Sequence, residues 1–346
     1  MKSKKIKKEY LLIIIVLVVV ALLGLLIYLT TSKKESKDNL PSTTTTSTTK
    51  KVTIVNEGSK SRPYAIMINN VEGARKLQSG LQDAYMVYEL MVEGGITRYL
   101  ALFLDQTTER IGSIRSARHY YLDYALENDA IYVHHGYSPQ AREDWNKLGV
   151  DRIEVNESTT GWRDKNASKT YEFTLFTNIE KLGKGIGSKR TERNKDLLLN
   201  YSADPVDLSN IEGTTTANKI NIRYSSNTTT NYTYDSENNV YLRSVNNKSQ
   251  NDYVTGKQLT VKNIIVYKVK YSGIPGDDKG RQNMDNVGNG TGYYISNGYA
   301  VPITWKKDSR ESQTIYKYNN GEEIKVNDGN TFIQIMPDNQ TLEINE

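Results

Sequence analysis

The segment Ile111-Gly112-Ser113-Ile114-Arg115-Ser116-Ala117-Arg118 decides the predicted fold of this 346-residue chain. Its apolar start, followed by Gly and Ser, indicates the end of a strand and a tight turn. The pattern that follows predicts a helix from Ala117 to about Glu127, with two arginines in its first turn. Cations at a helix N-terminus are unfavourable by roughly a few tenths of a kcal/mol, because the helix dipole is positive there. A break of a local rule is either noise or a functional site.

Apolar runs on both sides of this turn predict strands. Residues 64–68 (YAIMI) and 130–133 (AIYV) match buried strands. Gly94-Gly95 favours a hairpin between residues 81–92 and 96–104, although 81–92 also fits one face of a helix. Ser138-Pro139 predicts the start of another helix, because Ser favours the N-cap and Pro the first helical position. Strands that alternate with helices indicate an α/β layered domain with a mixed sheet over residues 61–205.

The remainder of the chain, residues 206–346, lacks helical periodicity. Short runs rich in Tyr, Val and Ile are separated by turn residues, and Asn297-Gly298 and Asn320-Gly321 are strong hairpin signals. Residues 288–292 (GNGTG) are predicted to form a flexible loop. We therefore predict a mainly antiparallel β domain, of sandwich or barrel type. The predicted fold class is α+β or α/β, preceded by an N-terminal membrane anchor helix.

The first sixty residues differ in composition from the rest. Residues 11–29 are nineteen apolar residues, which at ~1.5 Å each span a bilayer core of ~30 Å. We predict a transmembrane anchor at 10–29, after a basic cytoplasmic tail at 1–9 that keeps the N-terminus inside the cell. A cleaved signal peptide is the alternative, but its apolar region would be shorter. Residues 30–60 are rich in Thr and Ser and predict a flexible tether.

The net charge of +5 comes from the N-terminal segment. Residues 1–51 contain ten lysines and three acidic residues, so this segment has a charge of +7 and the rest of the chain −2. The basic balance therefore does not indicate nucleic-acid binding, and no nucleic-acid partner is predicted. The chain has no Cys, which excludes disulfides, thiolate metal sites and a lipid-modified cysteine. We expect a single-pass cell-membrane protein with extracellular C-terminal domains.

Arginines and strand ends supply the candidate site. Arg115 and Arg118, with the backbone N–H groups that follow Ser116, would form a cradle for an anion, because guanidinium groups fit phosphate or carboxylate. Ligands of α/β sheets tend to bind at the carboxyl ends of strands. The predicted ligand-binding set is therefore Arg98, Arg115, Ser116, Arg118, His134, His135, Glu93, Asn69 and Asn70. The alternative is that the arginines form ordinary ion pairs with Glu89, Glu93 or Asp123.

The histidine pair does not favour a metal site. His134 and His135 are adjacent, and adjacent residues of a strand point to opposite faces, so the two cannot readily bind one ion. One of them could act as an acid, a base or an anion partner. Asp83, Glu89 and Glu93 could hold a divalent ion, but their spacing does not force them together. No metal, no cofactor and no catalytic residue is predicted.

A set of short motifs runs through the chain after residue 61: RPYAIMINN at 62–70, QSGL at 78–81, VYE at 87–89, VEGGITR at 92–98, IG at 111–112, IRSAR at 114–118, YVHHG at 132–136 and VPITWKK at 301–307. This set resembles the YerB-like family of extracytoplasmic bacterial proteins. The resemblance implies two domains at the cell surface, often in lipoproteins, and no established activity. The chain departs from the family by lacking a lipid-attachment Cys and by having KTYE at 169–172, where a His-containing segment is expected.

Together these observations predict a membrane-anchored extracytoplasmic protein of the envelope of a Gram-positive-type bacterium. Its α/β domain would bind an anionic envelope ligand, such as a phosphate-linked glycopolymer or a lipid-linked precursor. Two alternatives stay open: a phosphoryl-transfer or hydrolytic enzyme that uses the same site, and a non-enzymatic scaffold for cell-wall enzymes. The expected partners are the membrane, and a cell-wall polymer or envelope proteins. The oligomeric state is left open.

Overall fold

The computed structural model describes residues 19, 21, 23 and 50–346 of the chain. Among these residues, no helix is long and apolar enough to cross a membrane. The predicted tail at 1–9, most of the anchor at 10–29 and the tether up to residue 49 lie outside the described residues. The anchor helix in the predicted fold class is therefore without support from the structure.

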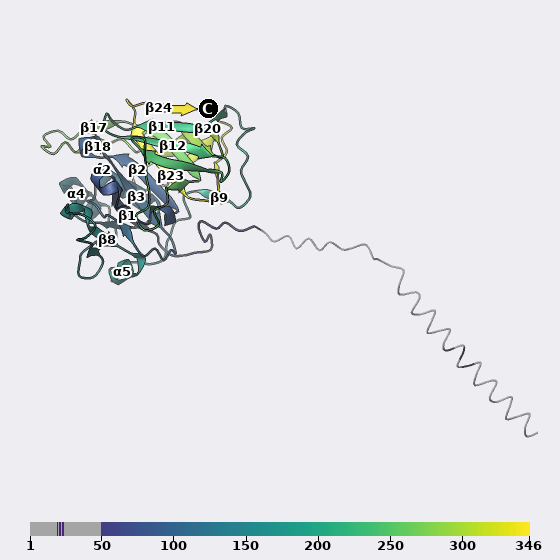
Figure 1. The fold of residues 1–346 in the computed structure, drawn as a ribbon, viewed down its shortest axis with the longest axis horizontal. Coiled ribbons are helices and arrows are strands. Elements are labelled where there is room, and N and C mark those ends of the chain that lie inside the picture. Colours follow the sequence, from purple (N-terminus) through teal and green to yellow (C-terminus); the bar gives the residue numbers. More distant parts are fainter. Residues whose placement is uncertain (1–18, 20, 22, 24–49) are drawn as a thin grey trace, which may run out of the picture. The chain divides into compact units, whose positions relative to one another are not determined.

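Strands dominate the described residues, of which 39% are in strands and 13% in helices. The prediction of an α/β or α+β fold is therefore wrong, because the protein is mostly β with mixed and antiparallel sheets (Figure 1). The physical reason is that residues 206–346 add strands and no described α-helix, while the strands Met86–Met91 and Thr97–Phe103 of the first half join through a hairpin. The helices are also short: α2 Glu72–Arg75, α3 His119–Glu127, α4 Pro139–Lys147 and α5 Ile179–Lys184.

The largest sheet of the described chain has eleven strands, in the order β10-β20-β19-β16-β23-β2-β3-β1-β5-β6, with β21 paired to β20. Their bounds are β1 Tyr64–Asn69, β2 Met86–Met91, β3 Thr97–Phe103, β5 Ile131–His134, β6 Arg152–Glu154, β10 Thr215–Thr216, β16 Asn263–Val269, β19 Gly288–Ser296, β20 Tyr299–Lys307, β21 Ile315–Tyr318 and β23 Thr331–Pro337. Strand β23 lies parallel to both β2 and β16. The segments 61–205 and 206–346 thus contribute strands to one sheet (Figure 1).

Several local predictions are confirmed in this sheet. The segments 64–68 and 130–133 correspond to β1 and β5. Strands β2 and β3 form an antiparallel hairpin, and Gly94 and Gly95 in its connection have φ of 73° and 67°, which glycine adopts most easily. Asn297-Gly298 joins β19 to β20. Residues 288–292 were expected to be a loop, but they begin β19, so that prediction is wrong.

A second sheet of six strands covers one face of the large sheet. Its order is β14-β13-β12-β11-β24, with β15 paired to β13, and all its pairs are antiparallel. The bounds are β11 Lys219–Arg223, β12 Thr229–Asp235, β13 Val240–Val245, β14 Lys248–Ser249, β15 Thr260–Val261 and β24 Leu342–Asn345. Side chains such as Ile220 and Tyr232 share a core with Val87, Val266 and Phe332 of the large sheet. The burial of this apolar surface holds the two sheets together.

Helix α3 packs on the opposite face of the large sheet. Its Tyr120, Tyr121 and Tyr124 are buried in a core with Leu90 and Leu100. Three smaller sheets complete the described fold: β4 Ile111–Gly112 with β8 Leu175–Thr177 and β7 Trp162–Arg163, β9 Asn200–Ser202 with β22 Lys325–Asn327, and β17 Tyr271–Gly273 with β18 Gln282–Met284. Many of the 25 tyrosines of the sequence therefore serve as core residues.

Candidate functional site

The segment that carries Arg115 runs as extended backbone between β1 and the end of β5. Arg115 N donates to Met67 O at 2.9 Å, and its carbonyl accepts from His135 N at 3.1 Å. Helix α3 begins only at His119, and Arg118 is its N-cap, with φ −129° and ψ 147°. The prediction of two arginines in the first helical turn is therefore wrong. The backbone groups of Arg115 bond to neighbouring strands instead of to a helix.

Two arginines of the predicted set share one carboxylate. Arg118 Nε donates to Glu93 Oε2 at 2.9 Å, and its Nη2 contacts the other oxygen of the same carboxylate. Arg98 Nη2 lies 3.6 Å from Glu93 Oε1, and Arg98 Nη1 donates to Ser116 O at 2.7 Å. Glu93, Arg98, Ser116 and Arg118 are thus brought together. For Arg118, the ordinary ion pair with Glu93 is present.

The pKa values of these residues show how strongly the charged form of the Glu93 carboxylate is stabilised. Burial raises the pKa of Glu93, but the hydrogen bond from Arg118 and the charges of Arg98 and Arg118 outweigh burial and lower the pKa to about 2. Burial and the like charge of Arg118 lower the pKa of Arg98 to about 10, against the opposing effect of Glu93. Both groups therefore remain charged at neutral pH.

Arg115 completes what we call the arginine cluster, namely Arg98, Arg115 and Arg118. Among the described residues Arg115 has no ion pair, and its buried Nε has no hydrogen-bond partner. Arg98 Nε, Asn69 Nδ2 and Ser113 Oγ are also buried without partners. Burial lowers the pKa of Arg115; the charges of Glu172 and Glu93 oppose this effect, and the like charge of Arg118 adds to it. The cluster therefore holds more positive charge and more hydrogen-bond donors than its own carboxylate can satisfy.

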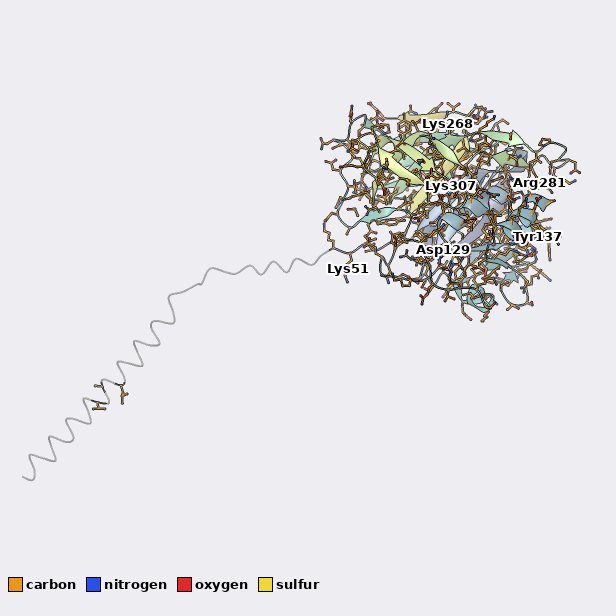
Figure 2. The ribbon with its side chains drawn as sticks, turned by 180° about the vertical axis from the view of Figure 1, so that it is seen from behind. Lys51, Asp129, Tyr137, Lys268, Arg281 and Lys307 are labelled. Atoms are coloured by element: carbon orange, nitrogen blue, oxygen red, sulfur yellow. The ribbon has the colours of Figure 1, made fainter. Side chains whose placement is uncertain are left out.

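The two histidines make different contacts at the end of β5, where His134 is the last residue of the strand and His135 follows it. His134 is buried, with Nδ1 2.9 Å from Gly136 O and its ring stacked on Trp145 at 5.2 Å. Burial lowers the pKa of His134 to about 4. His135 Nδ1 lies 2.8 Å from Val155 O. Tyr137, labelled in Figure 2, is 41% exposed and packs edge-on against Trp145 at 5.0 Å.

The two asparagines also separate, and Asn70 leads to a buried network that sequence reasoning missed. Asn70 Nδ2 donates to Thr97 Oγ1 at 2.7 Å and to Glu89 Oε1 at 3.2 Å. Glu89 and Arg243 form an ion pair at 2.5 Å, and both side chains are fully buried between the two sheets. The alternation Tyr241-Arg243-Val245 in β13 places Arg243 on the inward face, which is a signal that the sequence contained.

The carboxylates considered for a divalent ion lie in different places. Glu89 pairs with Arg243, Glu93 with the arginine cluster, and Asp83 accepts from Thr108 Oγ1 at 2.8 Å. Over the residues that the structure describes, no three His, Asp or Glu side chains are grouped as a metal site would require. Asp123, the other predicted arginine partner, pairs instead with Arg310 at 2.7 Å.

Comparison with known proteins identifies the family. The model of the N-terminal domain of "Protein of unknown function (DUF3048)" matches residues 48–193, and the model of the C-terminal domain matches residues 220–333. The chain belongs to the DUF3048 family. One relative, "Putative lipoprotein YerB" of Bacillus subtilis (strain 168), is 30% identical over 295 residues, which are 83% of this chain and 85% of the relative. The resemblance to YerB-like proteins is confirmed.

The structures agree with this assignment. The crystal structure of the YerB protein from Bacillus subtilis matches with a TM-score of 0.68 and 27% identity, over 82% of this chain and 94% of that chain. The arginine cluster lies within the match to the DUF3048 N-terminal domain, and the Glu89–Arg243 pair joins a residue of that match to one of the C-terminal match. The family description itself assigns no activity.

Proposed function

We propose that this DUF3048 protein is an extracytoplasmic protein of the cell envelope that binds an anionic ligand at the arginine cluster. The location is supported by the relative that is named a lipoprotein. Because the sequence contains no cysteine, membrane attachment would use the apolar residues 11–29 rather than a lipid. The expected ligands are a phosphate-linked glycopolymer or a lipid-linked precursor.

The observation that carries the proposal is the unsatisfied state of Arg115 beside two further guanidinium groups. Its buried Nε lacks an acceptor among the described residues, as does that of Arg98. A buried donor without a partner costs about 1–3 kcal/mol. A bound phosphate or carboxylate would supply acceptors to these donors, and negative charge to Arg115 and to the two arginines that share Glu93. The free energy of binding an anion at this cluster is therefore expected to be favourable.

Isothermal titration with poly(glycerol phosphate) tests this function. Arg115→Gln removes the cation that forms no ion pair with described residues, so the Glu93 contacts of Arg98 and Arg118 stay intact. A charged hydrogen bond contributes about 1.5–3 kcal/mol, so we expect binding at least tenfold weaker and an unchanged melting temperature. Arg142→Gln is the matched control, because Arg142 is exposed on α4 and forms no ion pair with described residues.

The titration has two outcomes that decide against the proposal. One is equal affinity for the wild type and Arg115→Gln; the other is an equal loss in the Arg142→Gln control. Vesicles that contain a polyprenyl phosphate provide a second arm. Binding to the vesicles but not to the polymer would assign the ligand to the lipid-linked class.

A further inference from the structure

A second pocket lies outside the arginine cluster, between α2 and the loop that follows β14. Its volume is about 520 Å³, and its lining includes Glu72, Arg75, Lys248, Gln250 and Tyr253. Pockets for small ligands usually measure roughly 300–1,000 Å³. The pocket thus has the size for a small molecule, and its walls come from both family domains.

The exposed aromatic ring of this pocket is held on a fixed loop. Tyr253 is 46% exposed, and its backbone N donates to Gln78 O at 2.8 Å. The buried Asp252 carboxylate accepts from the backbone N–H groups of Gly80 at 2.8 Å and of Val254 and Thr255 at 2.9 Å each. These bonds fix the backbone on both sides of the ring, so little entropy is lost when a ligand stacks on it.

The ring is also supported from one side. The guanidinium carbon of Arg110 lies 4.8 Å from the centroid of the Tyr253 ring and 3.7 Å from that of Phe176. Arg110 is therefore sandwiched between the two rings, and it pairs with Asp164 at 3.0 Å. Tyr253 presents the rest of its ring to solvent and to the pocket. A supported, exposed ring is suited to the apolar C–H face of a sugar, which loses little hydration on stacking.

Some charged groups at the pocket have partners within the protein, whereas the charge of Arg75 is not paired with that of any described residue. Lys248 pairs with Glu72 at 2.7 Å, and the Asp252 carboxylate already accepts the three backbone N–H groups named above. Arg75 Nε donates to Asn70 O at 3.1 Å and to Asn70 Oδ1 at 3.2 Å. Arg75 forms no salt bridge with any described residue, and its terminal nitrogens have no acceptor there. The terminal nitrogens of Arg75 are therefore available to pair with an anionic group of a ligand.

We propose that this pocket binds an acidic sugar. The sugar ring stacks on Tyr253, and its carboxylate or phosphate pairs with the terminal nitrogens of Arg75. Gln250 forms the buried floor: it is 2% exposed, and its Nε2 donates to Tyr99 OH at 3.1 Å. The site is separate from the arginine cluster, so the two proposals stand or fall independently.

Titration with three sugars, followed by ligand-observed NMR and calorimetry, tests the pocket. The probes are N-acetylmuramic acid, which has a carboxylate, N-acetylglucosamine, which has the same ring without it, and a glucose phosphate. We expect the two acidic sugars to bind at least tenfold more tightly than N-acetylglucosamine. Tyr253→Ala and Arg75→Gln are each expected to weaken binding about tenfold, the loss of one stacking or one charged contact.

The controls are matched in kind. Tyr171 is 57% exposed and lies against Arg163, so Tyr171→Ala removes a similar ring elsewhere, and Arg142→Gln removes an exposed cation. Both are expected to leave sugar binding unchanged. Equal binding of N-acetylglucosamine, unchanged binding in Tyr253→Ala, or absence of binding by all three sugars would overturn the proposal. A preference between the carboxylate and the phosphate probe identifies the anionic group.

Discussion

The Glu89–Arg243 ion pair connects the two sheets, so we predict that breaking it destabilises the protein. Both side chains are fully buried, and Glu89 also accepts from Thr97 Oγ1 at 2.6 Å and from Thr230 Oγ1 at 3.2 Å. Arg243→Met leaves the Glu89 carboxylate buried without its cation. Removing one partner of a buried pair costs about 3–5 kcal/mol, which is a large share of the roughly 5–15 kcal/mol that stabilises most domains.

Urea denaturation followed by circular dichroism measures this loss. Glu72→Gln is the matched control, because it breaks the exposed pair with Lys248, in which both side chains are at least 69% exposed. Exposed pairs contribute about 0–1 kcal/mol. The double variant Glu89→Gln with Arg243→Met should lose less than the sum of the single losses, because it buries no unpaired charge. Equal losses in Arg243→Met and Glu72→Gln would refute the reasoning.

Two other perturbations follow from the structure. The pKa of Glu93 is lowered from 4.5 to about 2, so its contribution to stability is complete above pH 4.5 and is lost as the pH falls towards 2. That contribution is at most about 3 kcal/mol. Denaturation measured at stepwise lower pH should show this loss of stability in the wild type and not in Glu93→Gln. Identical pH profiles of the two proteins would contradict the prediction. Gly80→Ala should destabilise the protein more than Gly149→Ala, as melting temperatures can show. Both glycines have positive φ, but a Cβ at Gly80 would lie 2.7 Å from Arg110 O, whereas nothing lies within 4 Å at Gly149. The strain alone costs roughly 1–2 kcal/mol, and equal losses would show that the contact has no effect.

Local signals predicted local structure well. Ser138 is the N-cap of α4, and its side chain accepts from Ala141 N, as the Ser138-Pro139 pair indicated. Gly94-Gly95 marked the β2–β3 hairpin. In both cases the determining contacts lie within a few residues, so the residue types suffice to reveal them.

Contacts between distant segments could not be predicted in the same way. The parallel pairing of β2 with β23 joins Met86 to Thr331, and no short-range pattern encodes such a partner. The same holds for Arg115, whose helical expectation was overridden by hydrogen bonds to β1 and β5. The predicted site was therefore partly assembled: Arg98, Glu93, Ser116 and Arg118 meet, whereas Asn70 and His134 point elsewhere.

The central place of β23 has a consequence for biosynthesis. Strand β23 lies between β2 and β16, yet it is formed by residues 331–337, close to the C-terminal end of the chain. Until these residues have been synthesised, β2 keeps one row of unpaired N–H and C=O groups, which can pair with other chains. Completion of the sheet therefore has to wait for the synthesis of residues 331–337. A chain that stops before residue 331 would leave the edges of β2 and β16 unpaired. We expect such a chain to be bound by chaperones or degraded by proteases.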